Sequence, residues 1–314
     1  MISRQTLRKV MLYVLSIAIF WNALIAIRAY RFTHFQTFVP LQTTQTAGVF
    51  DYFINRFTGQ QYYKIPTKTF PALPYSVIQL TTSNNLKLEG WHIPNYNAKG
   101  TVIIMHGLNG NKETMLAEAY SFQKVGYSTL LIDFRAHGNS EGTKCTLGLD
   151  EAEDVKLAYE YIKNTGEKNI VLYGASMGAA TISYAMHKYN LAATKVILDM
   201  PFASYSQLIE KFFKDSKYPT QPTSTMFTFW AGVFNKSWFF SMKPSEYVKD
   251  IKCPTLLQWG RTDGLVPQQA TELIYANIGA TNKTLKIYDQ CGHEHFCTKQ
   301  KEEWDTTVTN FLQN

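Results

Sequence analysis

The chain has 314 residues, of which 45% are hydrophobic, enough to bury one large core or two small ones. Its net charge is +7. Most of this excess lies before residue 35, where no acid balances Arg4, Arg8, Lys9, Arg28 and Arg31. The rest of the chain carries nearly equal numbers of acidic and basic side chains, so a nucleic acid is not the expected partner.

Residues 10–27 form an apolar run that only Ser16 and Asn22 interrupt. The run is just long enough for a membrane span and long for the core of a cleaved signal peptide, and no small-residue cleavage site follows. We therefore predict a single-pass, uncleaved signal anchor over residues 1–34, with a removed signal peptide as the alternative. The slight excess of basic residues before the run favours a cytoplasmic N-terminus and an extracytoplasmic domain.

Residues 35–70 show no sustained periodicity, which predicts a tether and a lead-in that packs on a domain formed by residues 71–314. Short strand-like stretches in this domain cover residues 75–82, 86–93, 101–105, 128–134, 169–173, 195–199, 254–259 and 284–288. Helical patterns alternate with them, most clearly over residues 150–163. The alternation predicts an α/β fold with a mostly parallel, eight-stranded sheet flanked by helices and a hairpin at its start.

One interruption, at about residues 203–242, is dense in aromatic side chains. They are Phe212, Phe213, Phe227, Phe229, Trp230, Phe234, Trp238, Phe239 and Phe240. Because the insertion follows directly after a predicted central strand, we expect a small cap above the carboxyl ends of the strands. A helical excursion that buries its aromatics in its own core is the alternative.

The most informative stretch is residues 170–178, where a buried strand runs into Gly-x-Ser-x-Gly and then into a helix-compatible run. This order places Ser176 at the tip of a strained turn, with glycines where strand and helix pass closely. The positive end of the new helix points toward the serine. The motif therefore predicts a nucleophilic hydroxyl.

A serine needs a base to take its proton and an acid to orient that base. Asp263 lies in the loop after the strand at 254–259, and His293 lies in the loop after the strand at 284–288. Two other assignments stay open. Asp199, at the end of an earlier strand, is a second candidate acid, and His295 is a second candidate base.

The chain resembles α/β-hydrolases of the serine esterase, lysophospholipase-like and aminopeptidase-like type from about residue 75 to the C-terminus. The motifs that carry this resemblance are His106-Gly107-Leu108-Asn109-Gly110, residues 133–142, residues 174–178, and the loops of Asp263 and His293. The resemblance implies Ser176 as nucleophile, His293 as base and Asp263 as its orienting acid. It also implies an oxyanion hole from the backbone N–H groups of Leu108 and Met177. It implies that His106, His137 and Arg135 shape their loops and do not react.

The segment 291–297 carries two histidines at alternate positions between Cys291 and Cys297. This spacing fits a single tetrahedral ion poorly, so we expect no metal. The two cysteines are a possible disulfide, which the sequence leaves open. We also expect no cofactor, because the chain has no glycine-rich loop of the phosphate-binding type.

The predicted function is that of a membrane-anchored serine hydrolase that cleaves a carboxylic ester or related acyl bond. The aromatic cap and the anchor favour lipid-like acyl substrates such as lysophospholipids, monoacylglycerols or thioester lipids. An aminopeptidase-like amidase is the nearest alternative, and it would need an acidic group for the substrate's amine. A non-catalytic, membrane-tethered binding protein and an acyltransferase on the same fold are the others.

Overall fold

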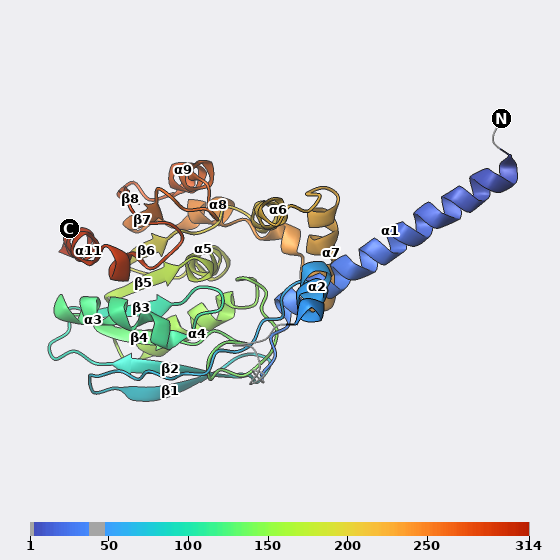
Figure 1. The fold of residues 1–314 in the computed structure, drawn as a ribbon. Helices are drawn as coiled ribbons and strands as arrows, with labels where there is room; N and C mark the ends of the chain where they lie inside the picture. Colours follow the sequence, from blue (N-terminus) through green and yellow to red (C-terminus); the bar gives the residue numbers. More distant parts are fainter. Residues whose placement is uncertain (1–2, 38–47, 314) are drawn as a thin grey trace.

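The computed structural model describes residues 3–37 and 48–313. Its centre is an eight-stranded sheet with the order β1-β2-β4-β3-β5-β6-β7-β8 (Figure 1). The strands are β1 (Ser76–Thr81), β2 (Lys87–Ile93), β3 (Thr101–Met105), β4 (Ser128–Ile132), β5 (Ile170–Ala175), β6 (Lys195–Asp199), β7 (Thr255–Gly260) and β8 (Lys283–Tyr288). β1 and β2 form an antiparallel pair, β2 joins β4 antiparallel, and the remaining neighbours are parallel. The predicted α/β class, strand number and mostly parallel sheet are confirmed.

Helices cover both faces of the sheet. The helices of the sheet domain are α3 (Leu116–Lys124), α4 (Ala152–Asn164), α5 (Met177–Tyr189), α8 (Pro244–Tyr247), α9 (Gln268–Asn277), α10 (Phe296–Lys299) and α11 (Lys301–Gln313), with 3-10 turns η1 (Lys112–Met115) and η3 (Val248–Asp250). Two hydrophobic cores result, one that includes α4 and α5 and one that includes α3 and α11. In β3, Ile103 faces the first core and Ile104 the second. A strand buried on both faces must be apolar throughout, which is why the central strands are short, continuous apolar runs.

The aromatic insertion forms α6 (Tyr205–Asp215), α7 (Thr223–Asn235) and the 3-10 turn η2 (Phe239–Ser241). Part of its aromatic content fills a small core, since Phe213, Phe227 and Phe239 are fully buried. Another part faces outward: the side chains of Phe229 and Trp238 are 49% and 65% exposed. Both readings of the insertion therefore hold in part, because α6 lies beside the cavities described below while α7 packs against the N-terminal helix.

The N-terminal apolar run lies within one continuous helix, α1 (Arg4–Thr33). Within the described residues, it is the helix that is long and apolar enough to cross a membrane. Figure 1 shows its first turns projecting from the domain, on the side opposite the C-terminus. Its last turns are part of the fold, because Ile25, Ala29 and Phe32 are buried in the first core.

A helix that the sequence analysis did not predict, α2 (Val49–Thr58), lies beside α1. The preceding residues 38–47, part of the predicted tether, lie outside the described residues. Contacts from distant parts of the chain hold α2 in place: the Arg56 guanidinium lies 4.2 Å from the ring centre of Tyr218 and donates to the Ser216 carbonyl. The stretch after α2 pairs with the end of the N-terminal segment through a bridge between Gln36 and Tyr63, and it contacts the sheet domain where the Thr69 N–H donates to Glu113 Oε2 at 2.7 Å.

Candidate active site

Ser176 occupies a strained turn between β5 and α5. Its backbone φ is 51°, a left-handed conformation that a non-glycine residue adopts only where its surroundings enforce it. The Ser176 N–H donates to the Asp199 carbonyl at 2.8 Å, which fixes the turn to β6. A side chain at Gly178 would place its Cβ 2.3 Å from the Met105 carbonyl oxygen, so the helix approaches β3 this closely only because the position is glycine.

The loops after β7 and β8 bring Asp263 and His293 to this serine. His293 Nε2 lies 2.9 Å from Ser176 Oγ, and His293 Nδ1 lies 2.8 Å from Asp263 Oδ2. The other oxygen of Asp263 accepts two backbone N–H groups, those of Leu265 and Val266, both at 2.8 Å. These bonds hold the carboxylate in one orientation, and the Asp263 side chain is fully buried. The structure thus brings together the three side chains that the sequence analysis singled out.

This arrangement can move a proton along a defined path. An imidazole with one nitrogen at the hydroxyl and the other at a carboxylate accepts the serine proton while the carboxylate stabilises the resulting cation. The side chain of His293 is 21% exposed, so it also reaches water or a leaving group. Such a geometry can activate a serine hydroxyl for attack on an acyl carbon.

The two predicted oxyanion donors line the same cavity as Ser176. They are the backbone N–H groups of Leu108, in the loop after β3, and of Met177, the first residue of α5. Neither N–H donates a hydrogen bond within residues 3–37 and 48–313. The loop runs directly beside the serine, since a Cβ at Gly107 would lie in van der Waals contact with Ser176 Cβ, at 3.5 Å. Two such donors can stabilise negative charge that develops on a carbonyl oxygen.

The alternative acid and base have other partners. Asp199 is buried beneath the site and accepts hydrogen bonds from Tyr173 Oη and Gln258 Nε2, both at 2.6 Å. Burial raises the pKa of its carboxyl to about 7. His295 lines the cavity, but its Nδ1 lies 2.8 Å from Glu118 Oε1, and this hydrogen bond raises the pKa of His295. Neither is bonded to His293 or to the Ser176 hydroxyl in the described residues.

Asp199 also belongs to a chain of hydrogen bonds between strands. Tyr173 on β5 donates to Asp199 on β6, Gln258 on β7 donates to Asp199, and Tyr288 on β8 donates to Gln258 at 2.6 Å. All four side chains are buried. These hydrogen bonds therefore link four neighbouring strands, β5 to β8, directly below the site. We call the four side chains and their hydrogen bonds the interstrand network.

The other histidines and the arginine of the motifs have partners of their own, and His137 Nδ1 lies 3.0 Å from the Arg135 carbonyl. His106 Nδ1 lies 2.7 Å from the Gly107 carbonyl, and its Nε2 accepts the Phe134 N–H. Burial lowers the pKa of His106 to about 4, so the ring is neutral at neutral pH. Arg135 forms an ion pair with Asp154.

Two buried charge pairs near the site escaped the sequence analysis. Lys112 is fully buried and pairs with Asp133, while Glu118 is fully buried and pairs with His295. A buried charge is tolerated when it is paired in this way. The partners lie far apart in the sequence, so no local pattern pointed to either pair.

The side chains of segment 291–297 diverge. His293 faces Ser176 and His295 faces Glu118, while Cys297 lies 3.6 Å from Ser121 Oγ. Cys291 and Cys297 are separate free thiols in the structure. Residues 3–37 and 48–313 contain no group of histidine, cysteine and carboxylate side chains arranged to hold a metal ion.

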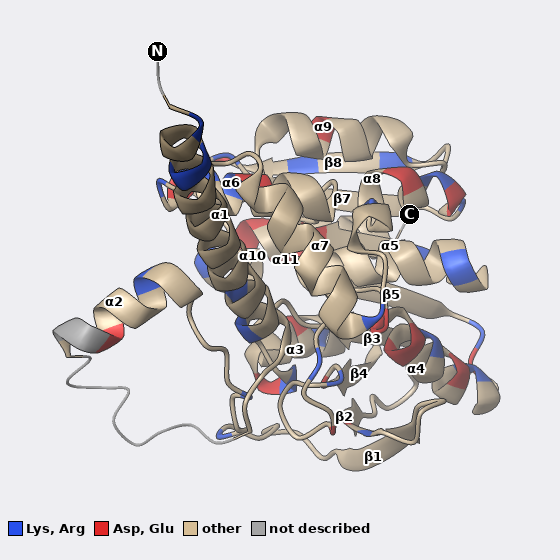
Figure 2. Cartoon of the chain, turned by 90° about the vertical axis from the view of Figure 1, so that its right-hand side faces the viewer, with Lys and Arg blue, Asp and Glu red and all other residues tan. Residues whose placement is uncertain are grey.

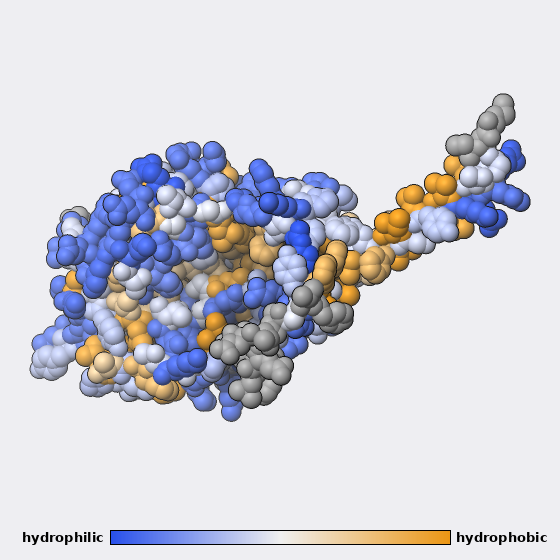
Figure 3. Space-filling view, in the orientation of Figure 1, coloured by the Kyte–Doolittle hydropathy of each residue, from blue (hydrophilic) through white to orange (hydrophobic). Residues whose placement is uncertain are grey.

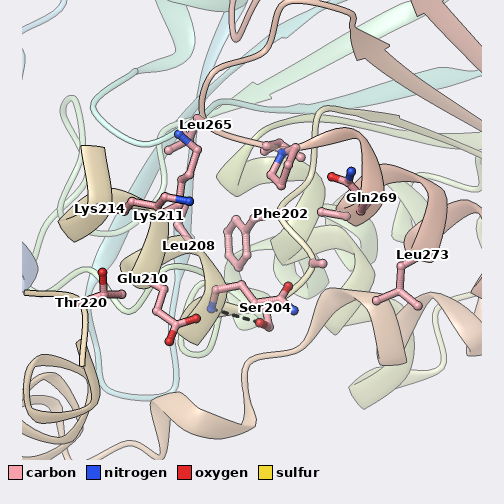
Figure 4. Close-up of a pocket in the computed structure, with 15 residues that line it drawn as sticks. Phe202, Ser204, Leu208, Glu210, Lys211, Lys214, Thr220, Leu265, Gln269 and Leu273 are labelled. Atoms are coloured by element: carbon pink, nitrogen blue, oxygen red, sulfur yellow. Dashed lines mark hydrogen bonds between the residues drawn. The ribbon is translucent and has the colours of Figure 1, made fainter. Parts of the chain in front are cut away.

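Two adjoining cavities lie at this edge of the sheet. The first, of about 280 Å³, is lined by Ser176, His293 and the predicted oxyanion residues Leu108 and Met177. The second, of about 420 Å³, lies between α6 and α9 and shares the walls Phe202, Leu208, Leu265 and Val266 with the first. Figure 4 shows Phe202 and Leu208 within it, with Lys211 and Lys214 at one side and Leu273 at the other. We call this second cavity the α6–α9 groove.

The fold and the strand-end position of Ser176 define the class of this protein: it is an α/β hydrolase. Its sequence matches the profile of the serine aminopeptidase S33 family over residues 96–239 and 231–300. The chain belongs to that family.

Relatives extend the likeness over most of the chain. An esterase of Pyrococcus furiosus, Pf2001, superposes with a TM-score of 0.66 at 27% identity, covering 80% of this chain and 97% of the esterase. The uncharacterised Bacillus subtilis protein YqkD is 26% identical over 79% of this chain and 82% of its own length. A Saccharomyces cerevisiae protein described as an uncharacterised membrane protein is 27% identical over 79% of this chain and 83% of its own. The chain is therefore an esterase-like hydrolase.

Proposed function

We propose that this chain is a membrane-anchored serine hydrolase that cleaves carboxylic esters of apolar acyl groups through a covalent acyl-serine. The observation that carries the proposal is the continuous hydrogen-bonded path from Ser176 Oγ through the His293 ring to Asp263. Ser176 is the nucleophile, His293 the general base and then acid, and Asp263 the residue that orients and stabilises the imidazolium.

The reaction has two halves. Ser176 Oγ attacks the acyl carbon as His293 Nε2 takes its proton, and the carbonyl oxygen becomes an oxyanion held by the N–H groups of Leu108 and Met177. The C–O bond to the alcohol then breaks and His293 returns the proton to the leaving oxygen. In the second half, His293 deprotonates a water that attacks the acyl-serine, and the acid leaves as Ser176 recovers its proton.

The α6–α9 groove supports an apolar acyl group as the part of the substrate that is bound. It opens from the Ser176 cavity across shared apolar walls, and Ala270 and Leu273 continue its apolar lining along α9. An acyl chain lying in it would bring its carbonyl carbon to Ser176. Lipid-like esters such as monoacylglycerols and lysophospholipids fit this description.

The anchor is α1. Its exposed apolar turns have no partner in the described residues that would keep them from water, and a yeast relative is described as a membrane protein. We propose residues 1–34 as an uncleaved anchor, 35–70 as the lead-in, and 71–314 as the hydrolase domain with its cap at about 203–242. The basic residues that precede the span favour a hydrolase domain outside the cytoplasm.

The direct test is to label the full-length, detergent-solubilised protein with a fluorophosphonate and map the modified peptide by mass spectrometry. We expect a single modified residue, Ser176, together with hydrolysis of p-nitrophenyl esters. A folded protein that neither reacts with the probe nor hydrolyses esters would overturn the mechanism and favour a binding protein. Acyl groups that appear on added alcohol in preference to water would favour a transferase.

Amide cleavage has one supporting feature. The Glu294 side chain lines the Ser176 cavity beside His293, where its carboxylate could receive a substrate's amino group. Its Oε1 already accepts the Gly292 N–H at 3.2 Å. Turnover of amino-acid p-nitroanilides that is lost in Glu294→Gln, with ester hydrolysis retained, would favour the aminopeptidase function over the ester hydrolase.

Narrowing the α6–α9 groove is expected to shift the chain-length preference. Leu273 lines the groove at its outer end and is 43% exposed, so Leu273→Trp can block the groove without disturbing the core. We expect kcat/KM for long-chain p-nitrophenyl esters to fall about tenfold or more, a loss of about 1.4 kcal/mol, with acetate hydrolysis unchanged. Leu73→Trp, at an equally exposed leucine outside the groove, is the control. Equal losses for acetate and long chains would contradict the assignment of the groove.

A further inference from the structure

The part of α1 that stands clear of the domain is too short to cross a bilayer. Side chains are exposed up to Phe20, and contacts with the rest of the chain begin at Trp21, whose ring packs on Tyr218. The apolar run begins at Val10, so its free part rises about 16 Å at 1.5 Å per residue. The hydrocarbon core of a bilayer is about 30 Å thick. The missing length lies in residues 21–27, which run alongside the domain (Figure 1).

The element beside those turns is α7, and it is unusually apolar. None of its residues is charged, as Figure 2 shows along the helix next to α1. Trp230 on α7 contacts α1 through a hydrogen bond to Asn22, and the ring of Phe234 packs edge-on against Tyr30. On its outer side α7 exposes Phe229 and Val233, four residues apart on one face, by 49% and 48%.

Two polar side chains of the apolar run have hydrogen-bond partners within the protein. Ser16 Oγ donates to the Leu12 carbonyl within the helix at 2.9 Å. Asn22 Oδ1 accepts the indole N–H of Trp230 at 2.9 Å. In hydrocarbon a polar group must be satisfied internally, because no water is available. The bond between Asn22 and Trp230 therefore suits a pair of helices that lie together in lipid.

The next turn of α1 marks a polar boundary. The Arg28 guanidinium lies 4.7 Å from the ring centre of Tyr218, and Arg31 donates to Asn55 on α2 at 3.1 Å. At this level α2 exposes Phe53 and Phe57. A short helix with an arginine on one side and aromatics on the other is typical of the headgroup layer. Figure 3 shows apolar residues along α1 between its basic tip and the domain.

We propose that the occupant of this surface is the lipid bilayer: α7 lies in the membrane beside α1 with Phe229 and Val233 facing acyl chains, and α2 lies at the headgroups. The proposal rests on the anchor assigned to α1 under the proposed function. It accounts for the missing length of the span, because residues 21–27 and α7 enter the membrane together. Since α6 packs on α7, it also sets the α6–α9 groove next to the lipid surface.

The test uses the full chain reconstituted in phosphatidylcholine vesicles. Three of the four cysteines are buried, so a Cys253→Ser background leaves no accessible thiol. In that background Phe229→Cys, or Val233→Cys should the first not fold, carries an environment-sensitive NBD fluorophore. We expect blue-shifted emission that nitroxides on lipid acyl chains quench strongly. The same label at Phe53→Cys should be quenched best by headgroup nitroxides. Val77→Cys on β1, 55% exposed, is the control and should behave as in water.

Two failures are distinguishable. If the protein is released from the vesicles by alkaline carbonate, the anchor fails and this proposal fails with it. If the protein floats with the vesicles but the label at position 229 or 233 emits as the label at position 77 does, the anchor stands and the membrane position of α7 is overturned. The second result would mean that α1 spans by thinning the bilayer around it.

Discussion

Replacing Ser176 with alanine is expected to lower kcat for p-nitrophenyl ester hydrolysis about a millionfold and to abolish fluorophosphonate labelling. The hydroxyl that we propose as nucleophile is lost, and removal of the nucleophile of such a set costs about as much as removal of the whole set. A residual rate of about a thousandfold over water should remain, because the oxyanion donors are backbone groups that the substitution leaves in place. Stopped-flow and long-time-course assays together cover this range.

The matched control is Ser183→Ala on the same helix. Ser183 is buried and its hydroxyl donates only to the Ala179 carbonyl one turn earlier, so its loss should leave labelling and kcat unchanged. If Ser176→Ala retained labelling, another nucleophile would be at work and the assignment of Ser176 would be wrong. Equal loss in both variants would instead point to damage to α5.

Replacing Asp263 with asparagine is expected to lower kcat about ten-thousandfold with little change in KM. The asparagine amide can donate to His293 Nδ1, which would force the proton onto Nε2, the nitrogen that must accept from Ser176. The new side chain has nearly the same shape, and its oxygen can still accept the N–H groups of Leu265 and Val266. Circular dichroism and fluorophosphonate labelling rates then separate a chemical defect from a folding defect.

The same substitution at Asp199 decides between the two candidate acids. Asp199→Asn keeps an acceptor for Gln258 and a group that can bond Tyr173, so we expect kcat within about tenfold of wild type. If Asp199→Asn removes activity and Asp263→Asn does not, Asp199 orients the base and the geometry around Asp263 is not that of the working enzyme.

The strands of the sheet could be predicted because the sequence patterns that indicate them are local. The central strands are mostly apolar runs, and both ends of each observed strand lie within two residues of the ends of the expected stretch. Expected and observed strand ends differ where a polar residue still pairs in the sheet or where an apolar residue has already left it. Phe134, for example, was expected in a strand, but β4 ends at Ile132 and Phe134 folds back to donate its N–H to His106.

The N-terminal region was harder to predict because contacts over long distances shape it. α2 is held by the contact between the Arg56 guanidinium and the ring of Tyr218, more than a hundred and fifty residues away. No sequence pattern near α2 predicts that contact. The last turns of α1 likewise read as a membrane span in sequence, but Ile25 and Phe32 belong to the domain core. Hydropathy alone cannot separate a side chain that faces lipid from one that faces protein.

The candidate site was easier to predict than the N-terminal region and harder to predict than the sheet. Ser176, Asp263 and His293 follow strand ends, so their common location could be predicted from the order of strands. The choice of Asp263 over Asp199 could not be derived from the order of the strands alone. Asp199 lies at the end of β6 and Asp263 follows β7, and these two strands are neighbours in the sheet. The choice depends on the turn after Gly260, which aims the Asp263 carboxylate at His293 through two backbone N–H groups.

The interstrand network has a consequence for how such a protein can change over time. It joins β5, β7 and β8, the strands whose loops carry Ser176, Asp263 and His293, and it does so below those loops. The distances among the three side chains are therefore set by the sheet and owe little to the cap. Insertions or substitutions in α6 and α7 can therefore remodel the groove while Ser176, Asp263 and His293 keep their mutual positions.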